Sequence, residues 1–334
     1  MTSPKNKDAT NRPQSTVHRR IVALAGGVGG AKLAHGLAQI LPPEDLTVIV
    51  NTGDDFEHLG LTICPDLDTV CYTLAGLANP DTGWGRENET WYTISNIEKL
   101  GGPNWFRLGD QDFATHLERT RRMKEGQSLS QITKDFCKAW GIKQTVLPMS
   151  DSPVRTIVDT DEGELAFQEY FVHRHCEPRV KGFRFEGVEA ARCAPVIGAR
   201  EAIESAEAII ICPSNPWVSI DPILRVLSLT PSPLSHGERG WGEGKKFVAV
   251  SPIIDGKTVK GPAAKMYAEL GIEPSALAVA EHYRNLLAGF VLDSKDEQLS
   301  DKFRGKILVT NTLMNSPADR ARLAMDVLQF VGSL

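Results

Sequence analysis

The stretch IVALAGGVGGAKLAHGL, residues 21–37, decides the fold. A short apolar run is followed by Gly26, Gly27, Gly29 and Gly30, and then by Leu and Ala at helical spacing. Glycines after a strand let the backbone approach a ligand, and the N-terminus of the next helix favours an anion. The stretch therefore predicts a strand, a phosphate-binding turn and a helix.

This glycine loop matches neither of two common nucleotide-binding patterns. It lacks the G-K-[ST] ending of a P-loop, and Lys32 stands where the last glycine of G-x-G-x-x-G belongs. We assign Lys32 to phosphate binding together with the four glycines. The alternative is that the glycines serve only close packing of the helix.

Six further short runs rich in β-branched residues resemble strands that are buried on both faces of a parallel sheet: 46–51, 145–148, 208–212, 247–251, 289–293 and 306–310. Segments with helical spacing lie between them, and the last begins with the capping pair Ser316 and Pro317. This alternation predicts an α/β fold with a doubly wound, mostly parallel, Rossmann-like sheet.

The middle of the chain departs from this pattern. Residues 154–172 alternate around Asp161-Glu162-Gly163 and predict a hairpin of two strands. We therefore expect a smaller inserted α+β subdomain at 111–195 and a Rossmann-like core at 20–110 and 196–334. Residues 1–19 are predicted to be a disordered tail, and 230–244, rich in Pro, Gly and Ser, a flexible insert within the core.

The amino-acid composition excludes several classes of protein. The 334 residues are 41% hydrophobic and 24% charged, with a net charge of −5, which is typical of a folded protein that lacks the basic surface of nucleic-acid binders. No signal peptide and no apolar run of roughly 18 to 20 residues is present, so we expect a cytoplasmic protein without a membrane partner. Six scattered cysteines indicate buried thiols rather than a zinc site or disulfide framework.

Four aspartates follow the second predicted strand within NTGDDFEHLGLTICPDLDT, residues 51–69: Asp54, Asp55, Asp66 and Asp68. Such folds bind ligands at the carboxyl edge of the sheet. Carboxylates converging near a phosphate loop repel one another unless a cation lies between them, which favours Mg²⁺. The alternative is that Asp66 or Asp68 only caps a helix.

Other loops bring polar groups to the same edge. Arg107 is a fixed cation suited to a phosphate or carboxylate, and Ser214 and Asn215 follow a strand where they could bond a nucleotide, although PSNP is an equally good turn signal. In HRHC at 173–176, the two histidines share one face of an expected strand and the cysteine points away, which argues against a metal site.

Ten motifs in order carry a family resemblance: GGVGGAKL, NTGDD, ICPDLDT, WGRENETW, FRLGDQDFATH, LSQIT, LPMSD, FQEYFV, PSNPWVSI and SPII. The chain resembles the 2-phospho-L-lactate transferase family of coenzyme F-420 biosynthesis over residues 20 to 330. The resemblance implies a Rossmann-like, Mg²⁺-dependent homodimer. In that family the 5′-hydroxyl of the deazaflavin Fo attacks the phosphate of a guanylylated three-carbon acid and GMP is released.

The resemblance also implies residue roles. The glycine loop would cradle the phosphates of a GDP-type donor, and Asp68 and Arg107 match positions that the family uses for Fo. We assign Asp54 and Asp66 to Mg²⁺ from their clustering, which leaves the roles of the aspartates open to exchange, and Asp54 or Asp55 is the candidate base. The three-carbon acid, whether phospholactate, phosphoenolpyruvate or 3-phosphoglycerate, is not assigned.

Two other functions compete. A related family, the gluconeogenesis factors, has a similar glycine loop and would make the chain a non-catalytic regulator that binds a nucleotide sugar. An NAD-dependent oxidoreductase is suggested by the fold alone, but fold does not carry function.

Overall fold

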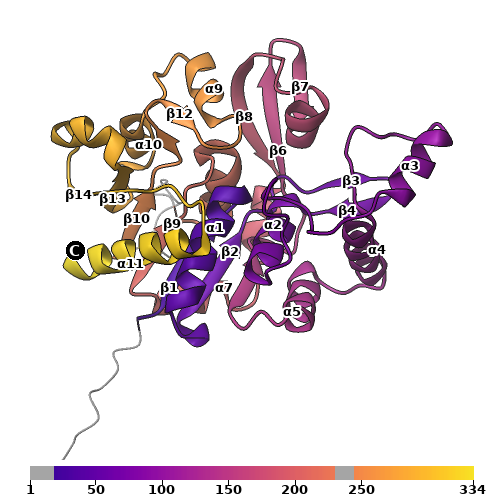
Figure 1. Cartoon of the computed structure of the whole chain (residues 1–334), viewed down its shortest axis with the longest axis horizontal. Helices are drawn as coiled ribbons and strands as arrows, with labels where there is room; N and C mark the ends of the chain where they lie inside the picture. Colours follow the sequence, from indigo (N-terminus) through magenta and orange to yellow (C-terminus); the bar gives the residue numbers. More distant parts are fainter. Residues whose placement is uncertain (1–18, 230–243) are drawn as a thin grey trace, which may run out of the picture.

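A computed structural model describes residues 19–229 and 244–334 of the chain. Its centre is a seven-stranded parallel sheet (Figure 1). In spatial order β14-β13-β10-β9-β1-β2-β5, its strands are Lys306–Thr310, Leu287–Asp293, Lys246–Val250, Ala208–Ile211, Ile21–Ala25, Leu46–Val50 and Thr145–Pro148. All seven predicted strands are confirmed, and with them the Rossmann-like α/β fold.

Helices cover both faces of this sheet, which explains why its strands are apolar throughout. In β1, Ile21, Ala23 and Ala25 face a core shared with α1 (Gly27–Ile40), α2 (Pro65–Leu74) and α11 (Pro317–Ser333). Val22 and Leu24 face the opposite core, built with α6 (Val188–Cys193), α7 (Ala199–Ser205), α8 (Asp221–Val226) and α10 (Ala276–Tyr283). Each layer therefore takes alternate residues of the same strand.

The strand order reverses at β1. The chain leaves β1 for β2 on one side and later returns to β9 on the other side. Loops that follow β1 and β9 diverge at such a switch point and leave a crevice at the carboxyl ends of the strands, where ligands bind in open α/β sheets. The glycine loop follows β1, and Ser214 follows β9.

Close packing of α1 depends on two of its glycines. A Cβ at Gly29 would lie 2.2 Å from the carbonyl oxygen of Pro213, and one at Gly36 would lie 2.1 Å from that of Arg320. Gly36 thus lets α1 and α11 lie side by side, as Figure 1 shows. The predicted cap of α11 is confirmed as a capping box between Ser316 and Asp319.

A second, three-stranded antiparallel sheet has the order β7-β6-β8: Gly163–Ala166, Arg155–Thr160 and Val180–Glu186. The predicted hairpin is confirmed at its turn, but the prediction of a second strand as far as residue 172 is wrong. Glu169–His173 forms a π-helix because Phe167 and Tyr170, three residues apart, are both buried against Val218 and Met266. The expected strand through HRHC is therefore absent, since His173 ends this helix and turns back to Glu169.

The range 111–195 contributes to both sheets, because β5 lies at the edge of the central sheet while β6, β7 and β8 form their own. The division into a core and an inserted subdomain stays a prediction. Most of the predicted tail (1–18) and of the predicted insert (230–243) lies outside the described residues.

The remaining elements are short. A hairpin of β3 and β4 (Phe56–His58, Leu61–Ile63) projects beside α3, α4 and α5 (Tyr92–Lys99, Asp110–Lys124, Leu129–Ala139), at the right of Figure 1. The others are η1, η3 and η4 (Pro43–Asp45, Pro216–Ile220, Ser294–Lys302), β11 and β12 (Ile253–Ile254, Lys257–Thr258) and α9 (Ala263–Glu269). Within the described ranges, every helix is too short or too polar to cross a bilayer. Four cysteine thiols are free and buried: Cys64, Cys71, Cys137 and Cys212.

Candidate active site

The glycine loop lies against both Ser214 and Asp66. The Ser214 hydroxyl accepts a hydrogen bond from the Gly26 amide at 3.2 Å and donates one to the Gly26 carbonyl at 2.8 Å. A Cβ at Gly26 would lie 2.7 Å from Asp66 Oδ2, and the Gly27 amide donates to the Asp66 carboxylate. The N-terminus of α1 thus already faces one anion, the side chain of Asp66.

Asn51, at the end of β2, holds this carboxylate in place. Its Nδ2 donates to Asp66 Oδ2 at 2.9 Å and to the Val218 carbonyl at 3.2 Å, and its Oδ1 accepts from the Gly53 amide at 2.8 Å. Asn51 is fully buried, so one amide side chain ties the loops after β2 and β9 to the acidic cluster. Asn51 is the first residue of NTGDD, and its role in the site was not predicted from the sequence.

Asp54 and Asp55 are buried, and one oxygen of each has no hydrogen-bond partner within the described part of the chain. Burial raises the pKa of Asp54 well above its usual range, and the neighbouring charges of Asp66 and Asp55 raise it further. Burial also raises the pKa of Asp55 to about 8 and that of Asp66 to about 6. Asp54 and Asp55 must therefore hold protons or face a cation at neutral pH, whereas Asp66 is largely ionised there.

This donor set fits a hard divalent cation. Unpartnered, buried carboxylate oxygens are the ligands that Mg²⁺ takes in proteins, and Asp54 and Asp66 lie close enough for each charge to disfavour the other. Binding of the cation would replace the protons.

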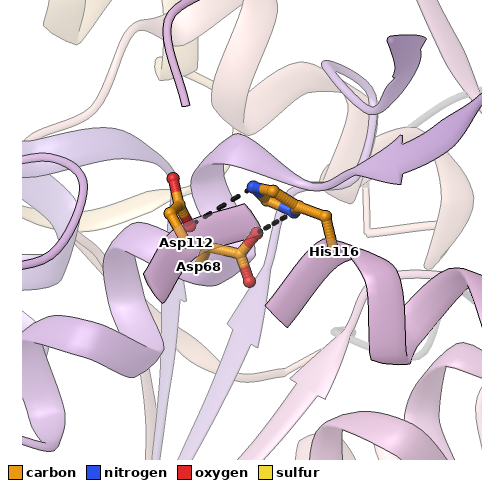
Figure 2. Close-up of side chains that lie close together, drawn as sticks. All are labelled: Asp68, Asp112 and His116. Atoms are coloured by element: carbon orange, nitrogen blue, oxygen red, sulfur yellow. Dashed lines mark ion pairs between the residues drawn. The ribbon is translucent and has the colours of Figure 1, made fainter. Parts of the chain in front are cut away.

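Asp68 faces a different environment. Arg119, from α4, is 2% exposed and holds the Asp68 carboxylate through both terminal nitrogens, one of them 3.0 Å from Oδ2. His116, one turn earlier on α4, lies between two carboxylates, with Nδ1 3.6 Å from Asp68 and Nε2 3.2 Å from Asp112 (Figure 2). Tyr72 donates to Asp112 at 2.8 Å.

Asp68, Asp112 and His116 have ligand atoms within 4.8 Å of one another and could hold a metal. Arg119 argues against it, because this buried cation already neutralises Asp68 and would repel a second one. Sequence reasoning missed both His116 and Arg119. The available signal was their three-residue spacing, which places them on one face of the helix in FATHLERT.

The structure does not bring Arg107 to the aspartates. Arg107 is exposed, and its guanidinium lies 5.0 Å from the centre of the Trp91 ring. Lys32 lies on α1 and donates to the Met314 carbonyl at 2.9 Å. Asn215 caps the helix η3 by accepting from the Trp217 amide at 3.1 Å, which is the turn role that its sequence context allowed.

A cavity of about 300 Å³ opens beside the acidic cluster. Its walls combine Asp54 and Asp55 with Arg155, Thr156, Phe167 and Gln168 from the smaller sheet and its following turn, and with Phe56 from β3. The hydroxyl of Thr156 is buried without a partner among the described residues. The cavity therefore offers apolar rings, polar side chains and the two carboxyls whose pKa values burial raises to one bound molecule.

Comparison with known proteins places the chain among transferases. The family model "2-phospho-L-lactate transferase CofD" matches residues 21–321. The chain is 45% identical to a phosphoenolpyruvate transferase of Kitasatospora aureofaciens, over 83% of this chain and 86% of that protein. It is 40% identical to a 2-phospho-L-lactate transferase of Methanosarcina mazei, over 92% of this chain and 99% of that protein.

Solved structures support the fold. A crystal structure of a UPF0052 family member from Bacillus halodurans superposes with a TM-score of 0.59 at 13% identity, over 93% of this chain and 98% of that one. At that identity the likeness concerns the fold alone.

Proposed function

Because the chain belongs to the 2-phospho-L-lactate transferase family, we propose that it transfers a phosphorylated three-carbon acid from a guanylylated donor to the 5′-hydroxyl of the deazaflavin Fo. The reaction would require Mg²⁺, release GMP and belong to coenzyme F-420 biosynthesis. The observation that carries this proposal is the pair of unpartnered carboxylate oxygens of Asp54 and Asp55 near Asp66, which itself lies against Gly26 and Gly27 of the glycine loop.

Transfer of a phosphate-type group depends on positioning of the two substrates and on neutralisation of their charge more than on a covalent bond to the protein. The 5′-oxygen of Fo attacks the phosphorus that carries the acid, and the bond from that phosphorus to the bridging oxygen breaks. GMP leaves with the bridging oxygen. The glycine loop would bind the diphosphate, with the Gly26 and Gly27 amides exchanging Ser214 and Asp66 for phosphate oxygens.

Asp55 or Asp54 accepts the proton of the attacking hydroxyl. A base works best when its pKa lies near the working pH, and burial raises the pKa of Asp55 to about 8. Asp54 and Asp66 would hold Mg²⁺, which, when bound, neutralises charge on the diphosphate. Asn51 keeps Asp66 oriented toward the glycine loop.

The cavity beside Asp54 and Asp55 suits the acceptor, because Phe56 and Phe167 offer apolar surface to a flat ring system and Thr156 and Gln168 can bond hydroxyl groups. Asp68 and Arg107 remain proposed Fo contacts by motif. Arg119 would hold Asp68 in one orientation, and Arg107 with Trp91 presents an exposed planar pair.

Mass spectrometry tests the proposal directly. Purified protein is incubated with Fo, Mg²⁺ and, in turn, the guanylylated forms of phospholactate, phosphoenolpyruvate and 3-phosphoglycerate. We expect a new Fo phosphodiester together with GMP, lost on chelation, and the productive donor identifies the acid.

Two variants examine the residues. Asp54→Asn and Asp55→Asn should lose product, whereas Asp159→Asn, on β6 beside Arg184, should keep it. Full turnover and unchanged Mg²⁺ dependence in Asp54→Asn would remove Asp54 from both roles. No product with any donor, together with tight binding of a nucleotide sugar, would favour the regulator. The proposed homodimer is tested by light scattering of the purified protein.

A further inference from the structure

One side of α1 carries an unassigned cluster of cations. Val28, Lys32 and Gly36 are four residues apart and so lie along one stripe of the helix. Two segments distant in sequence contact this stripe: the loop around Gly83, and the segment that leads from β14 into α11. Lys260, in the loop after β12, lies beside the first of them.

Lys260 lies over the first turn of α1. A Cβ at Gly83 would lie 2.7 Å from Val28 Cγ1 and 3.3 Å from Lys260 Nζ, so all three meet at one point. Lys260 Nζ donates to the Thr82 carbonyl. Val28 directly follows Gly27, whose amide binds Asp66. The lysine and the acidic cluster therefore flank the same turn of the helix.

Lys32 and Arg320 continue the cluster along the stripe. Lys32 Nζ donates to the Met314 carbonyl at 2.9 Å, in the loop before α11. Arg320, on the second turn of α11, packs its backbone against Gly36, and its Nε is buried without a partner within the described residues.

The positive charge of the cluster is not compensated. Burial lowers the pKa of Lys32, and the nearby Arg320 and Lys260 lower it further. Within residues 19–229 and 244–334, the hydrogen-bond acceptors of Lys32 and Lys260 are backbone carbonyls, and no carboxylate pairs with any of the three. Like charges held together without a counter-charge oppose folding, and an anionic ligand relieves that cost.

We propose that Lys32, Lys260 and Arg320 form an oxyanion subsite that binds the carboxylate of the acid on the donor. This inference rests on the proposed function. The donor carries a diphosphate and one carboxylate; the glycine loop and the acidic cluster account for the diphosphate, and the carboxylate is then the one anionic group left. All three candidate acids share it, so the subsite recognises their common feature rather than the difference between them.

Calorimetric titration of the full chain tests the subsite with Mg²⁺ present. Wild type, Lys260→Met and Arg320→Met are titrated with guanylylated phospholactate and with GDP, which has the diphosphate but no carboxylate. We expect each variant to weaken donor binding by about tenfold, as for a lost charged hydrogen bond, and to leave GDP binding unchanged. Lys306→Met is the matched control, because Lys306 likewise donates to a backbone carbonyl, that of Ser333 at 2.7 Å.

Three results would overturn the inference. Equal losses for GDP and donor would assign the cluster to the nucleotide phosphates. No loss for either would show that these cations serve only the loops. A lower unfolding temperature of unliganded Lys260→Met than of Lys306→Met would also show that Lys260 serves only its loop. Relief of repulsion should instead leave Lys260→Met at least as stable as Lys306→Met.

Small anions separate this inference from the proposed function. Free phosphoenolpyruvate and inorganic phosphate require no guanine recognition, so they test the cluster even if no guanylylated compound binds. We expect phosphoenolpyruvate to raise the unfolding temperature of wild type more than phosphate does, and the difference to vanish in Lys260→Met. An equal effect of both anions on wild type and variant would overturn the subsite.

Discussion

Replacing Asp66 by asparagine should stabilise the protein in the absence of divalent cations. Burial raises the pKa of Asp66 from its ordinary value of 3.8 to about 6, even though Asn51 and the Gly27 amide favour the charged form. That difference corresponds to about 3 kcal/mol between the charged and the neutral side chain. Asparagine mimics the neutral form, so about 3 kcal/mol is the upper limit of the gain.

The gain should depend on pH with a definite sign. Between about pH 4 and 6 the folded wild type retains a proton on Asp66 that the unfolded chain has released, so the free energy of unfolding falls as the pH rises through this window. Above pH 6 the loss is complete. Asp66→Asn should therefore match wild type near pH 4 and exceed it by up to about 3 kcal/mol at pH 8.

Urea unfolding at pH 4.5, 6 and 8 with a chelator present measures this difference. Asp293→Asn is the control, because Asp293 is also buried and accepts hydrogen bonds from the Thr312 amide and hydroxyl, so the loss of its carboxylate should destabilise the protein at every pH. The reasoning is refuted if Asp66→Asn is less stable than wild type at pH 8, or if its advantage is the same at pH 4.5.

Three further predictions follow from the same geometry. Mg²⁺ should raise the unfolding temperature more at pH 8 than at pH 5.5, because Asp54, whose pKa burial raises well above its usual range, must lose its proton to bind the cation; an equal rise in a scanning fluorimetry series would contradict this. Arg119→Met should cost about 3 to 5 kcal/mol in urea unfolding, because it leaves Asp68 buried without its cation, and Arg119→Lys should recover part of the loss. Gly29→Ala should cost about 1 to 3 kcal/mol and weaken GDP binding, because its Cβ would lie 2.2 Å from the Pro213 carbonyl oxygen; unchanged calorimetric affinity would argue against the loop as the phosphate site.

The central sheet was predictable because buried parallel strands leave a strong local signal. Seven short apolar runs became seven strands, since helices cover both faces of the sheet and most strand positions are therefore buried and apolar. The predicted second strand of the hairpin was too long for the opposite reason. Leu165, Phe167 and Phe171 fall on alternate positions and resemble a strand. Only the packing of Phe167 and Tyr170 with Val218 and Met266, far along the chain, selects a helical turn.

The same distinction applies to the site. Asp54, Asp55 and Asp66 were predictable as a cluster, because all three follow β2 and loops at the carboxyl edge of such a sheet converge on one crevice. Arg119 was not, because its partner Asp68 lies 51 residues away and a helical arginine in ERTRRMK is typical of a solvated face. Likewise, no local signal unites Lys32 with Lys260 and Arg320. Only the fold brings these three cations to one helix.

Two charge clusters lie close to the first turn of α1. A Cβ at Gly26 would lie 2.7 Å from Asp66 Oδ2, and a Cβ at Gly83 would lie 2.7 Å from Val28 Cγ1 and 3.3 Å from Lys260 Nζ. Neither cluster is neutralised by the other, since Asp66 is held by Asn51 and Lys260 by the Thr82 carbonyl. A molecule that binds a cation at one end and presents a carboxylate at the other relieves both repulsions at once. We therefore expect binding of such a donor to stabilise the protein, and part of the donor's affinity to come from removing the repulsion within the two clusters.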